Sequence, residues 1–218
     1  FLAAARNEIQ PMIFDSVVYK EELGSELADI EKVVSKAVTS ETFDQVGMRV
    51  ERFTFWMAFV TRKLSEANKL SDELEGTSVK VRRFARTDDR PQDFLNLHRL
   101  DEFYDLTNGE AQNKSVAWLG SQLIHSYVFA TRLDDDDQID GLFFNSDQSR
   151  EDSLWLIKWS EVTRTASLVA EDNIAWMVFD RESGKTRKSR TPMPADHPLP
   201  EGTSHVIPDD PSELGEAS

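Results

Sequence analysis

The stretch of sequence that decides the fold runs from Ser40 to Gly76 and reads SETFDQVGMRVERFTFWMAFVTRKLSEANKLSDELEG. Its apolar residues recur at alternating steps of three and four, the heptad pattern of a helix that packs along one seam. The positions on this seam are Phe43, Val46, Val50, Phe53, Met57, Val60, Leu64 and Ala67, and after a gap at Ser71 it resumes at Leu74. The pattern predicts one long helix with Ser40 as its N-cap and Gly76 at its end.

The middle of this helix is apolar on more than one side, because Phe55, Trp56 and Phe59 lie off the seam. Such a helix is buried on several sides. We therefore expect a partner helix on one side and a sheet on the other. The residues that could supply the sheet side are Trp155, Ile157, Trp176 and Val178. A homodimer through the heptad helices is the alternative. A membrane span is excluded, since the apolar run Phe53–Val60 is far shorter than roughly 20 residues.

A second heptad pattern precedes the first along the chain. Its apolar positions are Leu23, Leu27, Ile30, Val34 and Ala37. A short connection near Thr39 separates the two patterns, and two helices joined in this way form an antiparallel hairpin. The first 76 residues therefore predict a helical hairpin.

The second half of the chain is richer in strands. We expect strands at Tyr127–Leu133, Gly141–Asn145 and Ile174–Phe179, then a turn at Glu182–Lys185 and a basic, solvated strand at Thr186–Thr191. Ser153–Trp159 fits a buried strand or the start of a helix. Shorter helices are expected from Asp89 to Asn108, from Asn113 or Ser115 through Ile124, and after Ser160.

These patterns together predict an α+β fold, in which an N-terminal antiparallel helical hairpin and further helices pack on a small, mostly antiparallel sheet. Residues 1–191 are expected to form one domain, made of the hairpin (1–76), a part with a short strand or linker and helices (77–126) and a β-rich part with one helix (127–191). Residues 192–218 contain six prolines and no Lys or Arg, and read as an acidic, extended tail.

Composition restricts the partners. The 218 residues include 40 acidic and 25 basic side chains, for a net charge of −15. This charge argues against binding to nucleic acid or to an anionic membrane, both of which need basic surface, and permits a basic protein partner. The chain has no cysteine, which excludes disulfides, thiolate metal sites and cysteine nucleophiles. Without a basic-then-apolar start, we expect a cytoplasmic protein.

The most conspicuous polar feature is the acidic run Asp134, Asp135, Asp136 and Asp137, followed by Asp140. Four adjacent carboxylates repel one another and stay in water, so we expect a solvated loop between two strands. These five aspartates are the candidate residues for binding a partner. The spacing partly resembles a calcium loop, but that loop needs helices on both sides, and we therefore predict no metal site and no cofactor.

Other polar residues give weaker signals. Lys80, Arg82, Arg83, Arg86 and Arg90 form a basic patch that we expect to pair with carboxylates of the same chain, with an anion site as the alternative. His98 and His125 are expected to be structural. No nucleophile elbow, phosphate loop or dinucleotide fingerprint is found in the sequence.

These observations favour an acidic, non-catalytic interaction or inhibitor protein, of the immunity type, that acts on a basic protein partner. The alternative is a hydrolase that depends on carboxylates or a divalent metal, whose residues meet only in space. No catalytic residue can be assigned from the sequence. A deep pocket with converging polar groups would distinguish the enzyme from the binding protein.

Overall fold

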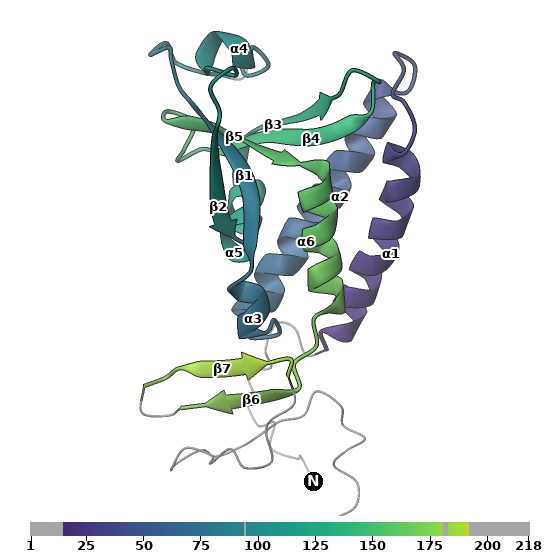
Figure 1. Ribbon diagram of the computed structural model, residues 1–218, viewed down its shortest axis with the longest axis vertical. Coiled ribbons are helices and arrows are strands. Elements are labelled where there is room, and N and C mark those ends of the chain that lie inside the picture. Colours follow the sequence, from purple (N-terminus) through teal and green to yellow (C-terminus); the bar gives the residue numbers. More distant parts are fainter. Residues whose placement is uncertain (1–14, 94, 181–182, 192–218) are drawn as a thin grey trace, which may run out of the picture.

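The computed structural model describes residues 15–93, 95–180 and 183–191 (Figure 1). The helices in these ranges are α1 (Val17–Val34), α2 (Phe43–Glu66), α3 (Asp72–Glu75), α4 (Leu100–Phe103), α5 (Val116–Ile124) and α6 (Trp159–Glu171). The strands are β1 (Ser78–Ala85), β2 (Glu110–Ser115), β3 (Ser126–Leu133), β4 (Ile139–Ser146), β5 (Ser153–Lys158), β6 (Trp176–Phe179) and β7 (Thr186–Ser189).

Five of the strands form one antiparallel sheet in the order β2-β1-β5-β4-β3, while β6 and β7 pair as a separate ribbon. The helices α5 and α6 pack on this sheet, α2 packs mainly on α5, and α1 packs on α2 and α6 (Figure 1). The predicted α+β fold, with helices packed on a mostly antiparallel sheet, is confirmed.

The helical hairpin is formed by α1 and α2. Near one end the ring of Tyr19 stacks on Trp56 with 6.4 Å between centroids, and farther along Glu26 pairs with Arg52 at 2.8 Å. Residue numbers thus rise on one helix as they fall on the other, as antiparallel packing requires. The heptad positions Leu23, Ile30, Val34, Val50, Phe53, Met57, Val60 and Leu64 are buried in the main core.

Both faces of the sheet are covered. On β5, Trp155 and Ile157 belong to the core under the helices, whereas Leu154 and Leu156 belong to a second core on the opposite face. This follows from the alternation of side chains along a strand. The second core is closed by α4 and its flanking residues, and its other buried members are Phe84, Leu100, Phe103, Tyr104 and Val128.

The long helix predicted from Ser40 to Gly76 is shorter in the structure. It begins at Phe43, with Thr42 as the N-cap residue, and ends at Glu66. Asn68 then takes a left-handed conformation with φ of 58°, which turns the chain. A new short helix starts where Ser71 Oγ accepts a hydrogen bond from Leu74 N at 3.2 Å. A glycine that ends a helix often takes a left-handed conformation, which we expected of Gly76, but its φ is −76° and the expectation is wrong.

The cover on the second side of α2 also differs from the prediction. Phe55 contacts Phe129 of β3, with 5.2 Å between ring centroids, and Trp56 stacks between Tyr19 and Phe59. Trp176 and Val178, which we expected there, lie in the separate β6–β7 ribbon.

The helix predicted from Asp89 to Asn108 is wrong, since among the described residues of that range only α4 is α-helical. Aspartate side chains hydrogen-bond nearby backbone amides in this segment, as Asp93 does with Leu95 N at 2.8 Å and Asp105 with Thr107 N at 3.0 Å. Such bonds favour turns over helix. The strand β2 was not predicted. Of the two expected N-caps, Ser115 caps α5 through Trp118 N at 3.1 Å.

The last ribbon is less solvated than expected. Lys188 in β7 is buried, and its Nζ lies 3.1 Å from Glu75 and 3.7 Å from Asp72. The acidic residues of α3 therefore hold this lysine. The predicted turn at 182–185 lies partly outside the described residues, and the predicted tail 192–218 lies entirely outside them. No helix of the described part of the chain has the length and apolar character needed to cross a membrane.

Candidate functional site

The acidic run forms the tight connection between β3 and β4. Asp134, Asp135, Asp136 and Asp137 are all exposed. The backbone turn is closed by Asp134 N, which donates to Gln138 O at 2.9 Å. The carboxylate of Asp134 also accepts hydrogen bonds from Asp136 N at 3.0 Å and from Gln138 N at 2.9 Å. The loop therefore has a defined shape that presents the remaining three carboxylates to solvent.

A backbone hydrogen bond fixes this loop against the helical hairpin. Val38 N, in the connection between α1 and α2, donates to Asp137 O at 2.8 Å. The tip of β3–β4 therefore lies beside the α1–α2 connection (Figure 1). Two more exposed acidic residues, Glu41 and Asp44, follow Val38 within six residues, so this end of the molecule carries an acidic surface.

Asp140 does not share the environment of the four consecutive aspartates. It lies in β4, where Arg132 of β3 pairs with it at 3.2 Å. Its Oδ1 is buried and has no hydrogen-bond partner. The structure therefore separates Asp140, whose charge is balanced by Arg132, from the exposed run. Within the ranges described, no group of three or more His, Asp or Glu side chains is arranged to hold a metal ion.

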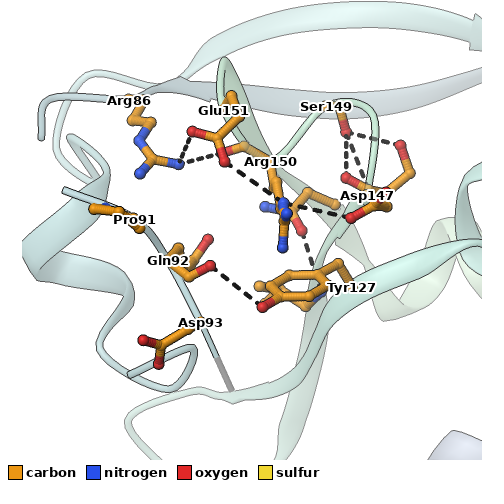
Figure 2. A network of polar contacts seen from close by, with 12 residues as sticks. Arg86, Pro91, Gln92, Asp93, Tyr127, Asp147, Ser149, Arg150 and Glu151 are labelled. Atoms are coloured by element: carbon orange, nitrogen blue, oxygen red, sulfur yellow. Dashed lines mark hydrogen bonds and ion pairs between the residues drawn. The ribbon is translucent and has the colours of Figure 1, made fainter. Parts of the chain in front are cut away.

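A second polar cluster surrounds Arg86, the residue that follows the last residue of β1 (Figure 2). The guanidinium of Arg86 is almost fully buried, with 6% of the side chain exposed, and it pairs with Glu151 at 3.2 Å. It also donates to three backbone oxygens, those of Asp88 at 2.6 Å, Arg150 at 2.8 Å and Arg90. Arg86 therefore ties the segment after β1 to the β4–β5 connection.

The hydroxyl of Tyr104 is the buried centre of this cluster. It lies 2.8 Å from Gln92 Oε1 and 2.8 Å from Arg150 O, and it accepts a hydrogen bond from Asn145 Nδ2 at 2.8 Å. Burial raises the pKa of Tyr104, against the opposing effects of the Arg86 charge and the Asn145 hydrogen bond. Tyr127 donates to Gln92 O at 3.2 Å (Figure 2).

The groups of this cluster bind mainly one another. The guanidinium of Arg150 lies 4.2 Å from the centroid of the Tyr127 ring and also pairs with Asp147 and Glu151 at 3.4 and 3.5 Å. Because these cations and hydroxyls are held by protein atoms, the cluster fastens residues 86–93 to the sheet. Its members come from distant parts of the chain, and no spacing in the sequence indicated it.

The basic patch follows the expected intramolecular pairing at two of its positions. Arg86 pairs with Glu151, and Arg90 pairs with Asp88 at 2.8 Å and with Glu102 at 3.2 Å. The Arg90 hydrogen bonds, from its backbone and its side chain, lower the pKa of Asp88. His125 lies in hydrogen-bond contact with Arg62, at 2.8 Å, which agrees with a structural role.

A surface depression of about 440 Å³ lies between the end of α1 and the start of α2. Its lining residues are Asp29, Lys32, Val33, Lys36, Ala37, Thr42, Val46 and Arg49. Asp29 pairs with Lys32 at 2.8 Å, and this hydrogen bond lowers the pKa of Asp29. The depression holds a single carboxylate, whereas acid–base hydrolysis by carboxylates uses two.

Comparisons with models of protein families, with curated proteins and with solved structures find no match to this chain.

Proposed function

We propose that this protein is a non-catalytic, cytoplasmic binding protein, of the interaction or inhibitor type, that recognises a basic protein partner through the loop Asp134–Asp137. The observation that carries the proposal is that the run is fixed in a tight turn and its carboxylates are exposed. No lysine or arginine in the described part of the chain forms an ion pair with these four side chains. Their charge is available to a partner.

The hydrolase alternative has less support. It requires two carboxylates, or a metal held by several ligands, converging in a pocket. The depression beside α1 holds Asp29, already paired with Lys32, and the buried cluster around Tyr104 is occupied by its own members. Asp140 is paired with Arg132. These observations support the acidic loop, rather than any of these groups, as the proposed functional surface.

The test replaces all four aspartates by asparagine. Asparagine keeps the side-chain oxygen with which Asp134 accepts two backbone hydrogen bonds, and it tolerates the left-handed conformation of Asp137, whose φ is 58°. The loop should therefore keep its shape while losing four charges. Basic proteins captured by the parent chain are identified by mass spectrometry and purified, and their association rates are measured by stopped-flow fluorescence.

Attraction between exposed charges acts mainly on the association rate and is screened by salt. For the parent chain we expect the rate to fall steeply between 0.1 M and 1 M salt, because the screening length drops from about 10 Å to about 3 Å. The asparagine variant should associate more slowly with a flatter salt dependence.

The control removes four exposed charges elsewhere, by replacing Glu21, Glu22, Glu31 and Glu51 with glutamine. This variant has the same net charge as the loop variant. If both variants slow association equally, only net charge matters and the loop has no special role. If binding ignores both salt and the loop variant, the proposed function is wrong.

A further inference from the structure

The strand β3 forms one edge of the five-stranded sheet and, among the residues that the structure describes, pairs only with β4 (Figure 1). Its register is shifted between Ser126 and Val128 and again between Arg132 and Leu133, which leaves a regular window at Val128–Arg132. Alternate residues of an edge strand direct their N–H and C=O groups away from the sheet. Within the described residues, no backbone or side-chain group bonds to the outward backbone groups of residues 129–132.

This edge lacks the protection by charge that edge strands usually have. Between Ser126 and Leu133 the single charged side chain is Arg132, and Asp140 neutralises it at 3.2 Å. The opposite edge, β2, reads EAQNKS and carries two charged side chains, those of Glu110 and Lys114. Lysines and other charges normally keep strands from adding to an edge. Of the two edges of this sheet, β3 is therefore the one open to a further strand.

Apolar surface accompanies the open edge. Phe55 of α2 contacts Phe129 of β3 with 5.2 Å between ring centroids, and both side chains are partly exposed. One helical turn farther along α2, Phe59 is 41% exposed. An added strand would thus find main-chain partners on β3 and aromatic contacts beside it, the two components of recognition by strand addition.

We infer that β3 receives an extended segment of the basic partner as an antiparallel sixth strand, an inference that rests on the proposed function. In an antiparallel pair the N-terminal end of the added segment lies beside Leu133, where β3 ends, and Asp134–Asp137 follow at once. The basic residues of the segment therefore precede its apolar part. The main-chain hydrogen bonds between β3 and the added segment provide affinity, and the aspartates favour a segment with basic residues.

Charge and size favour this occupant over a second copy of the chain. Two copies that each carry −15 repel one another, whereas a basic segment is attracted. A window of five residues spans roughly 17 Å. Pairing over that length buries far less than the roughly 1,000 Å² that a stable interface between folded proteins needs.

The experiment uses two designed peptides of the same composition. The first has two lysines followed by six alternating threonines and valines, and the second has the reverse order. We expect the first to bind at least tenfold more tightly by fluorescence anisotropy. Hydrogen exchange should show new protection at alternate amides of residues 128–132. Methylation of the peptide nitrogens at one alternate set of positions should abolish binding, and methylation at the other set should not.

A matched pair of protein variants locates the edge. Thr131→Lys places a charge in the middle of β3, and Gln112→Lys places the same charge in the middle of β2, where both parent side chains are half-buried. We expect Thr131→Lys to weaken peptide binding at least tenfold and Gln112→Lys to change it less than threefold. Circular dichroism checks that both variants fold.

Several results would overturn the inference: no binding of either peptide, equal binding of both, or no protection in β3 while peptide is bound. A dimer in ultracentrifugation that Thr131→Lys dissociates would assign the edge to a second copy instead. If the asparagine variant of the acidic loop loses the natural partner but β3 gains no protection in that complex, the proposed function stands and strand addition fails. If the loop variant binds the partner normally, the proposed function itself fails.

Discussion

Replacing Asp172 with alanine should destabilise the protein strongly, because its carboxylate joins the end of α6 to Ser71, the N-cap residue of α3. It follows the last residue of α6 and is 1% exposed. Its two oxygens accept hydrogen bonds from Ser71, at 2.7 Å from the backbone N–H and 2.5 Å from the hydroxyl. Its backbone oxygen accepts a further hydrogen bond from Nζ of Lys20 in α1.

The expected magnitude follows from the two hydrogen bonds of the side chain. A hydrogen bond to a charged group contributes about 1.5–3 kcal/mol, and a buried donor left without an acceptor costs its desolvation. Ser71 is fully buried, so its N–H and hydroxyl would find no water in place of Asp172. Asp172→Ala should therefore lower the free energy of unfolding by about 3–5 kcal/mol. Asp172→Asn keeps one acceptor and should cost about half as much.

Urea unfolding followed by circular dichroism measures this change. Asp105→Ala is the control, because Asp105 also accepts hydrogen bonds from its own turn, such as that of Thr107 N at 3.0 Å, but is solvated. We expect a much smaller loss of stability there, as for other substitutions of solvated residues. The double variant with Ser71→Ala should be less destabilised than the sum of the single variants. A loss below about 1 kcal/mol for Asp172→Ala, or simple additivity with Ser71→Ala, would refute the reasoning.

Two further predictions concern the sheet. Gly141→Ala should lower the urea midpoint, since its Cβ would lie 2.6 Å from the backbone oxygen of Ile157, and such overpacking costs about 1–3 kcal/mol. Tyr104→Phe should cost a similar amount, about 1–3 kcal/mol, because the amide of Asn145 loses its acceptor. Because the pKa of Tyr104 is raised above 10.0 in the folded protein, its contribution to stability is present below pH 10.0 and is lost as the pH rises further. Ultraviolet titration should show a late-ionising tyrosine that is absent from Tyr104→Phe.

The helical hairpin could be predicted because its signal is local and repeated. A heptad pattern reports burial along one side of a helix, and the buried positions Ile30, Val50 and Leu64 follow it. The one gap in the heptad pattern of Ser40–Gly76, at Ser71, marked the real break, where that serine caps α3. The pattern could not place the end of α2 at Glu66, because Ala67 continues the seam while Asn68 turns the chain.

The segment between β1 and β2 could not be predicted, because its structure depends on contacts with the sheet. Phe103 and Tyr104 are buried by Phe84 and Val128, which are distant in sequence. The strand β2 has no alternation of apolar residues, and its pairing with β1 as an outer strand defines it. The cluster around Arg86 was missed for the same reason, since Arg86 meets Arg150 across 64 residues.

The acidic loop and the open edge have different origins in the sequence. The loop was predictable because repulsion among adjacent carboxylates acts locally. Asp140 was grouped with these aspartates by its spacing alone. In the structure it lies in β4, where its side chain pairs with Arg132 of β3. The edge could not be predicted, since only the strand order shows that β3 has a single neighbour in the described part of the chain.

An apolar edge strand normally makes a protein prone to self-association. Here the regular window is short, because register shifts interrupt β3 at both ends, and a net charge of −15 opposes approach of a second copy. The same charge attracts a basic chain. Selection among occupants at this edge therefore rests on repulsion of the wrong partner as much as on contacts with the right one. If β3 receives a basic segment, as we propose, the acidic loop and β3 act as one surface, since the loop sets the sign of the charge that can reach the strand.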